Sequence, residues 1–210
     1  MTVINENTLH IAGKIVDFRE SHSYKQKNFY ELTLEVDRLS EIKDILSFIV
    51  PEDLLFRNDK IQIDKYIEIF GEVRMINRNK TEKHNIHVFG YVDEYKILSE
   101  EDYKALEEKN YVKLEGYVCK PPRERVTNKT HRKITDLLIA NNRTNRRSYY
   151  IPAIAWGNLS KMASKFVVGD KIIFEGRFQS RCYENTDENG NVIKYSVSEV
   201  SAVNIAIAEK

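Results

Sequence analysis

Aromatic and basic side chains recur together along the second half of the sequence, and this pairing is the clearest chemical signal in the chain. Exposed rings stack on bases while Lys and Arg contact phosphates, and proteins hold single-stranded nucleic acid in this way. We therefore predict a binding groove formed by a set of rings and a set of cations. The rings are Tyr150, Trp156, Phe178 and Tyr183, and the cations are Lys120, Arg123, Arg125, Arg143, Arg146, Arg147 and Arg181.

The alternation of a strand leaves one of these rings open to two interpretations. Trp156 and Ile154 point to one side of a strand, while Ala153 and Ala155 point to the other. The pattern alone therefore allows Trp156 to be either a core residue or a surface residue.

The two halves of the chain carry opposite net charge, which the overall value of +1 conceals. Residues 1–105 contain 15 Lys and Arg against 20 Asp and Glu, a net charge of −5. Residues 106–210 contain 18 against 12, a net charge of +6. Because nucleic acid binds where Lys and Arg displace its counterions, the second half is the expected binding half. The first half is expected to bind a partner protein or to form an oligomer.

No motif of an enzyme, a metal site or a cofactor site accompanies these residues. The sequence has no G-x-x-x-x-G-K-[ST], G-x-S-x-G, H-E-x-x-H or paired C-x-x-C pattern. His84 and His87 have a spacing that two metal ligands could use, but no third ligand is near, so we interpret them as surface residues at a strand end. We predict no catalytic residue, no metal, no cofactor and no small-molecule substrate.

Neither a membrane segment nor a secretion signal is expected. No apolar run approaches the ~20 residues that span a bilayer, and the first residues lack a basic stretch followed by an apolar one. Cys119 and Cys182 are expected to be reduced thiols, since they form no C-x-x-C pair. The predicted location is the cytoplasm.

Short runs of β-branched and aromatic residues, broken by turn residues, predict five strands in each half. The expected strands are 9–18, 29–38, 44–50, 66–77 and 86–98, then 110–119, 133–142, 149–156, 171–183 and 193–207. A short helix is expected before the fourth strand of each half, near 51–58 and 157–167.

The two halves repeat each other at a nearly constant offset, which indicates a duplication. Gly13 matches Gly116, 103 residues later, and Gly71 matches Gly176, 105 residues later. Five strands and one short helix in roughly 100 residues are typical of the OB-fold, a small Greek-key barrel.

We therefore predict an all-β protein of two tandem OB-fold barrels, at residues 1–98 and 110–210. A short helical linker is expected at residues 99–109, because Ser99 and Asp102 have the spacing of a capping box.

Six short motifs follow one another in the second half. They run from Asn110 to Gly116 (N-x-V-x-L-x-G), Pro122 to Arg125 (P-x-x-R), Ala140 to Arg143 (A-x-N-R), Ala155 to Leu159 (A-W-G-x-L), Gly169 to Arg181 (G-D-x-I-x-x-E-G-R-x-Q-x-R) and Tyr195 to Val200. Together they resemble the bacterial single-stranded DNA-binding protein family across nearly one whole OB domain. The first half resembles this family only through its likeness to the second.

The resemblance implies four positions at which bases stack. By position these are Tyr150, Trp156, Tyr183 and Asn145, so one of the four is not aromatic here. Asn158 stands where the family usually has a lysine after A-W-G, which removes a phosphate contact. The family's flexible tail with an acidic tip is also missing after the last expected strand. Because the family usually assembles four OB barrels, two barrels per chain imply a homodimer.

The first half offers no clear counterpart of this site. At the position of Trp156 it has Phe48, Ile49 or Val50, depending on the alignment. Four aromatic residues of this half could be stacking rings, but we interpret them as core residues: Phe29, Tyr30, Phe70 and Tyr91. A basic cluster after its fourth expected strand contains Arg74, Arg78, Lys80 and Lys83.

The function that the resemblance implies is non-enzymatic binding and protection of single-stranded DNA in replication, recombination or repair, at the nucleoid. Two alternatives stay open. One is an OB-fold protein that binds RNA, since a stacking groove does not intrinsically exclude RNA. The other is a scaffold for replication factors, in which the rings are core or interface residues.

Overall fold

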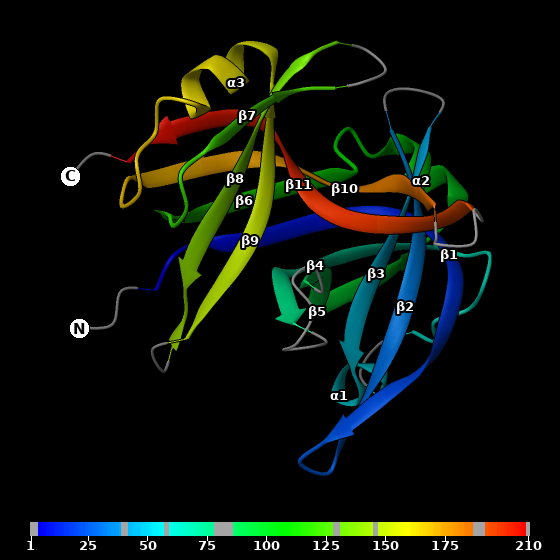
Figure 1. Cartoon of the computed structure of the whole chain (residues 1–210). Helices are drawn as coiled ribbons and strands as arrows, with labels where there is room; N and C mark the ends of the chain where they lie inside the picture. The colour runs from blue at the N-terminus through cyan, green and yellow to red at the C-terminus, as the bar shows by residue number, and fades with distance from the viewer. Residues whose placement is uncertain are drawn as a thin grey trace.

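The computed structural model describes residues 4–38, 42–56, 59–77, 86–127, 131–144, 147–186 and 192–208. Its elements are shown in Figure 1. In chain order they are β1 (Asn7–Tyr24), β2 (Lys27–Asp37), β3 (Lys43–Pro51), α1 (Glu52–Leu55), β4 (Tyr66–Asn77), β5 (Ile86–Leu98), α2 (Glu100–Ala105), β6 (Asn110–Val118), β7 (Arg123–Val126), β8 (Lys133–Asn142), β9 (Ser148–Trp156), α3 (Gly157–Ala163), β10 (Lys171–Thr186) and β11 (Val192–Ile207).

Each half of the chain closes into a five-stranded barrel. In the first barrel β1 pairs with both β2 and β4, and a short parallel contact between β3 and β5 completes the ring. In the second barrel β6 pairs with both β8 and β10, and β9 and β11 make the equivalent parallel contact. The prediction of an all-β protein with two OB-fold barrels is therefore confirmed.

One strand of the second barrel was not expected. The first barrel begins with a continuous strand of 18 residues, β1, whereas the second begins with β6 and continues as the separate strand β7. Pro121 and Pro122 lie in the break, where they cannot donate backbone hydrogen bonds to a ladder. The strand therefore stops at Val118, and β7 resumes pairing with β8 further along.

The repeated glycines Gly71 and Gly176 lie at the same irregularity in both barrels. Each follows a break in register between the fourth and fifth strands, after Phe70 in the first barrel and after Glu175 in the second. A Cβ at Gly71 would collide with the carbonyl oxygen of Tyr91, and one at Gly176 would collide with that of Ser201. Both positions therefore exclude any side chain.

The two barrels share one sheet and one core. Strand β1 pairs with β6, which joins all strands into a single 11-stranded sheet. The buried apolar side chains form one main cluster that runs through both barrels. Within it Phe48 meets Phe178 edge to face, with ring centroids 6.2 Å apart. The two barrels are therefore not independent domains.

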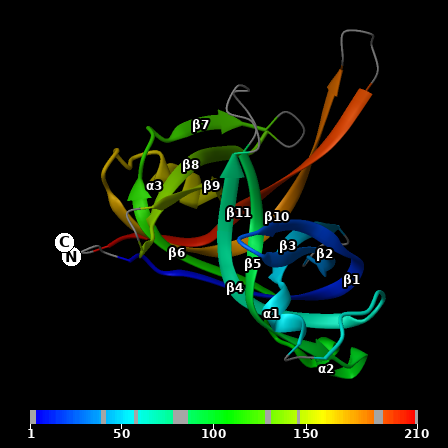
Figure 2. The ribbon, with the colours of Figure 1, turned by 90° about the horizontal axis from the view of Figure 1, so that it is seen from below.

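Beyond the ring of the second barrel, β10 and β11 continue together as a two-stranded arm (Figure 2). The free edge of this arm is held by side chains in place of a neighbouring strand. The Asn110 amide accepts from the backbone N of Phe178 at 2.8 Å and donates to its carbonyl at 2.7 Å. Asn7 binds the backbone of Val73 in the same two ways at the equivalent place in the first barrel.

The next residue of that edge is held by the first barrel. Asp44 is buried, and its Oδ1 accepts from the Ser180 backbone N at 2.6 Å and from the Ser180 hydroxyl at 3.0 Å. Arg38 donates to the Ser180 carbonyl at 2.6 Å and to Asp44. In the reverse direction, Arg143 of the second barrel forms an ion pair with the buried Glu72 of β4. Hydrogen bonds from the first barrel thus hold the base of the arm, and an ion pair from the second barrel holds β4.

A short helix, α2, joins the barrels as the sequence predicts. The Ser99 hydroxyl accepts from the backbone N of Asp102 at 3.0 Å, which is the expected cap. Helices α1 and α3 also begin near the predicted positions and end earlier than predicted. Among the residues that the structure describes, no helix is long and apolar enough to cross a membrane.

Candidate nucleic-acid interface

The outer face of β8 and β9 carries the predicted stacking rings of the second barrel. Along both strands buried and outward-facing residues alternate, with Leu137, Ile139 and Ile151 in the core. Tyr150 and Trp156 point the other way; Tyr150 is 45% exposed and Trp156 is half-buried. The structure therefore decides in favour of the outer face for Trp156.

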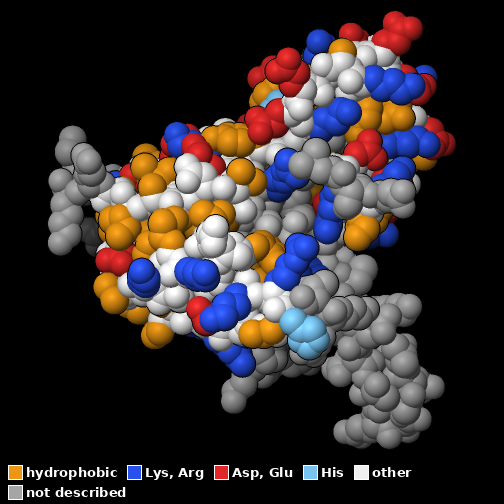
Figure 3. All heavy atoms as spheres, turned by 90° about the horizontal axis from the view of Figure 1, so that it is seen from above, with side chains coloured by type: hydrophobic (Ala, Val, Ile, Leu, Met, Phe, Trp, Pro, Cys, Tyr) orange, Lys and Arg blue, Asp and Glu red, His pale blue; other side chains and the backbone are white. Residues whose placement is uncertain are grey.

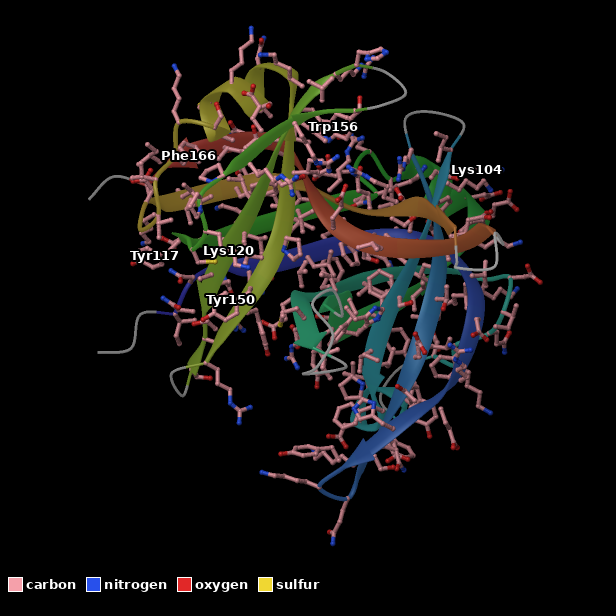
Figure 4. All side chains as sticks on the ribbon, viewed as in Figure 1. Lys104, Tyr117, Lys120, Tyr150, Trp156 and Phe166 are labelled. Atoms are coloured by element: carbon pink, nitrogen blue, oxygen red, sulfur yellow. The ribbon has the colours of Figure 1, made fainter. Side chains whose placement is uncertain are left out.

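Tyr150 and Trp156 stand near opposite ends of β9, as Figure 4 shows. Six residues of extended strand separate them by roughly 20 Å, given a rise of about 3.3 Å per residue. A single strand of nucleic acid that touches both rings must therefore run along β9 and place several nucleotides over this face.

Trp156 is held in place by the second barrel's own polar side chains. Its indole N–H donates to the Ser201 hydroxyl at 3.2 Å. The Arg181 guanidinium lies 5.4 Å from the centroid of the ring, a cation–π contact. Arg181 also donates to Glu199 Oε1 at 2.5 Å, and Gln179 donates to the same oxygen at 3.2 Å.

Glu199 is a nearly buried carboxylate beside this ring. Burial raises the pKa of its carboxyl above the ordinary value, and the nearby Arg181 charge acts in the opposite direction. A carboxylate in this setting depends on its cation, because an unpaired buried charge is costly. Any ligand that draws Arg181 away must therefore raise the pKa of Glu199 further.

The prediction that Phe178 is a stacking ring is wrong. Its side chain is fully buried and packs edge to face on Phe48, so no base reaches it. The physical reason is the two-residue period of a strand: Phe178 and Arg181 are three residues apart on β10 and face opposite sides. Since Arg181 faces the groove, Phe178 must face the core.

Besides Arg181, two of the predicted arginines already have carboxylate partners. Arg125 forms two hydrogen bonds with Asp136, at 2.6 and 3.0 Å. Arg143 reaches across to Glu72 in the first barrel, so it stabilises the contact between barrels. Phosphate must compete with a carboxylate at both places.

Three predicted cations are exposed and form no ion pair among the described residues: Lys120, Arg123 and Arg147. They flank the β8–β9 face, Lys120 and Arg123 beside β7 and Arg147 at the β8–β9 hairpin. Viewed from above, Lys and Arg side chains lie scattered among apolar ones, without a single continuous basic patch (Figure 3). Lys120, Arg123 and Arg147 are therefore candidates for separate phosphate contacts beside the rings.

Some predicted residues lie outside what the structure describes. Asn145 and Arg146 are outside the described ranges, as are Arg78, Lys80, Lys83 and His84 of the first half. The backbone of Tyr183 is part of β10, paired with Tyr195, but its side chain is not described. Their roles stay predictions.

Sequence reasoning missed the residues that hold the predicted site residues. Ser201, Glu199 and Asp136 orient Trp156, Arg181 and Arg125. No motif identifies Ser201 or Asp136, whereas Glu199 lies within the Tyr195–Val200 motif. Glu199 and Ser201 alternate with the buried Val200 on β11 and so share one outer face. Among the described residues, no group of three or more His, Cys, Asp or Glu side chains is placed to hold a metal ion.

The same face of the first barrel differs in chemistry. Leu32 pairs with Phe48 as Leu137 pairs with Ala153, which places Pro51 at the position of Trp156. The expected counterparts Phe48 and Val50 are core residues, and Ile49 corresponds to Ile154; the alignment of Trp156 with any of them is therefore wrong.

A groove of about 180 Å³ lies on this face of the first barrel. Its lining is formed by Ser21, His22, Glu31, Ser47, Ile49, Ile76, His87 and Phe89. No lysine or arginine lines it. It therefore differs in charge from the arginine-flanked face of the second barrel.

Comparisons with known proteins agree with the difference between the barrels. Residues 109–207 match the model of the "Single-strand binding protein family". The second barrel belongs to the single-strand binding protein family. The first barrel lies outside the matched residues, which fits the altered chemistry of its outer face.

Solved structures extend the likeness of fold to the whole chain. The wild-type single-stranded DNA binding protein of Thermus aquaticus superposes with a TM-score of 0.74 at 16% identity, over 99% of this chain and 95% of that one. A deletion mutant of the Thermus protein gives a TM-score of 0.75 at 16% identity, over 99% and 96%. At this identity the likeness shows the fold. No curated protein sequence matches the chain.

Proposed function

We propose that the chain binds and protects single-stranded DNA, without catalysis, on the outer face of its second barrel. The observation that carries this proposal is the outward position of Tyr150 and Trp156 on β9, within the residues that match the family. The face formed by strands two and three is the one that OB-folds use for oligonucleotides.

Binding combines stacking with an exchange of partners at arginine. Bases stack on Tyr150 and Trp156, each contributing about 1–3 kcal/mol. Lys120, Arg123 and Arg147 contact phosphates directly. Arg181 leaves Glu199 for a phosphate, because its guanidinium already lies beside the Trp156 ring. Since every base has an aromatic face, little sequence preference is expected.

We infer the biological setting from this proposed chemistry. A protein that coats strands without reading their sequence serves replication, recombination or repair, and it acts in the cytoplasm at the nucleoid. No step of bond making or breaking is assigned to it.

We further propose that two chains form a homodimer with four OB-folds. A row of three rings crosses the outer face of β4, β1 and β6, because His10 pairs with both Phe70 and Tyr111. His10 and Phe70 stack in parallel at 4.6 Å. Phe70 is 40% exposed, so its interpretation as a core residue is wrong. The antiparallel β1–β6 pair makes this face nearly symmetric, which suits a two-fold contact with a second copy.

The dimer has a direct test. Phe70→Arg places a charge in the centre of the proposed contact, so the mass measured by light scattering should fall from that of two chains to 24.7 kDa. A wild-type mass of 24.7 kDa contradicts the homodimer.

DNA binding is tested by titration with oligo-dT, oligo-U and duplex DNA, with Trp156, the only tryptophan, as the fluorescent probe. The proposal predicts strong quenching by oligo-dT, weaker effects of duplex DNA, and an affinity that falls as salt rises. Preference for oligo-U would favour RNA as the ligand. If the protein binds none of the three nucleic acids, the remaining candidate function is a protein-interaction scaffold.

A further inference from the structure

A row of three residues crosses the outer face of the second barrel at the Tyr150 end of β9. Tyr117 of β6 pairs with Ala140 of β8, and Ala140 pairs with Tyr150 of β9. The next residues along, Val118, Ile139 and Ile151, are all buried. The three members of the row therefore point outward together.

This row leaves room for a stacked base. Neighbouring strands lie about 4.8 Å apart, so the two tyrosine backbones are separated by about 9.6 Å. Side chains stand roughly perpendicular to a sheet. A base between two rings needs about 7 Å, twice the stacking distance of about 3.4 Å. Ala140 has only a methyl group between them, which leaves the space open.

A cation lies three residues along the chain from each tyrosine of this row. Lys120 is exposed and follows Tyr117 by three residues, and Arg147 is exposed at the hairpin before Tyr150. Figure 4 shows Tyr117, Lys120 and Tyr150 in one region of the second barrel. Neither cation is in an ion pair among the described residues, so a phosphate meets no competing carboxylate there.

The first barrel provides an internal comparison. The equivalent row is Lys14, Glu35 and Ile45. Lys14 pairs with Asp64 at 2.7 Å, and Glu35 pairs with Lys43 at 2.5 Å. A long charged side chain thus replaces the alanine, and a lysine replaces the first ring. The same backbone there offers no place for a base.

We propose that Tyr117, Ala140 and Tyr150 form a base-binding slot, with one base of the single strand held between the two tyrosine rings. The inference rests on the proposed function, because it assigns a subsite on the same face. Tyr117 lies outside the four stacking positions that the family resemblance implies, so the slot adds a fifth position and replaces the platform lost at Asn145.

Two substitutions test the slot in the full-length chain. Tyr117→Ala removes one wall, and Ala140→Leu fills the space. Each should weaken binding of oligo-dT about tenfold, which lies in the lower part of the range for one stacked base. Tyr117→Phe keeps the ring and should bind several-fold more tightly than Tyr117→Ala. The matched control is Ile45→Ala in the first barrel, which should bind like the wild type.

A second experiment uses the wild-type protein, so its result does not depend on whether a variant folds. Ultraviolet irradiation of the wild-type complex with oligo-dT containing 5-iodouracil should cross-link the peptide that carries Tyr117. The slot is overturned if the wild type binds oligo-dT while Tyr117→Ala and Ala140→Leu bind within twofold of it, or if Tyr117 is absent from the cross-linked peptides. A wild type that does not bind oligo-dT overturns the proposed function and the slot together.

Discussion

The two barrels have the same register and different outer faces. Their cores match pair by pair, since Leu32 faces Phe48 as Leu137 faces Ala153. On the outside, Pro51 stands in place of Trp156 and Ile45 in place of Tyr150. The duplication has therefore kept the residues that specify the fold, while the residues that face solvent differ in chemistry.

One pair is repeated on the outer faces of both barrels. Arg19 binds Glu31 at 3.0 Å in the first barrel, and Arg125 binds Asp136, the counterpart of Glu31, in the second, although Arg123 is the residue that pairs with Asp136 in the strand register. Because this pair also occurs in the barrel without stacking rings, it stabilises the first and second strands against each other. The comparison thus assigns Arg125 mainly a structural role.

The largest effect is expected in the shared core. Phe178→Ala removes a fully buried ring and should lower the free energy of unfolding by about 3–5 kcal/mol. Phe48→Ala, its partner from the other barrel, should cost a similar amount. Denaturant unfolding should show one transition for the whole chain, because the core is continuous. Two separate transitions would show that the barrels unfold independently.

A smaller effect is expected from the exposed ring. Trp156→Ala should weaken binding of oligo-dT by about 1–3 kcal/mol and leave the fold intact, because the ring lies on the outer face. Anisotropy of a labelled oligonucleotide measures the affinity, and circular dichroism checks the fold. If the Trp156→Ala protein is unfolded, Trp156 must be interpreted as a core residue.

The pH dependence follows from Glu199. Its pKa is raised by burial, so the folded state holds the proton more tightly than the unfolded chain does. The stability that this proton contributes is lost as the pH rises from the ordinary value of 4.5 through the raised pKa. If Arg181 also turns to phosphate, binding takes up a proton, and affinity should increase as the pH falls.

Glu199→Gln removes both effects. The variant should bind oligo-dT a few-fold more tightly at neutral pH, since no carboxylate competes for Arg181, and its affinity should lose this pH dependence. Titrations at several pH values at constant ionic strength measure the difference. An unchanged pH profile in the variant would mean that another group takes up the proton.

The smallest effects are expected at the repeated ion pairs. Arg19→Gln and Arg125→Gln should each change stability by about 0–1 kcal/mol, as partly exposed pairs do. Both should change DNA affinity little. A large loss of affinity in Arg125→Gln alone would show that this arginine contacts phosphate.

Much of the fold could be predicted because strands and duplications leave periodic patterns in a sequence. The side of the strand on which Trp156 lies could not be predicted. Ala153 and Ala155 on one side and Ile154 on the other are all apolar, so either side could face the core. Phe178 could have been excluded as a stacking ring, because it lies three residues from Arg181 on the same strand and must face the opposite side. The partners of the arginines depend on contacts between distant segments, such as Arg143 with Glu72 of the other barrel, and no local pattern encodes them.

The central claim is that the outer face of the second barrel, and not its counterpart in the first, binds the strand. Two matched double variants of the full chain test it: Tyr150→Ala with Trp156→Ala, and Ile45→Ala with Pro51→Ala. Titration with oligo-dT at one ionic strength should show a loss of at least about 30-fold in the first and a change of less than about threefold in the second. Equal affinities of the two double variants would contradict the account.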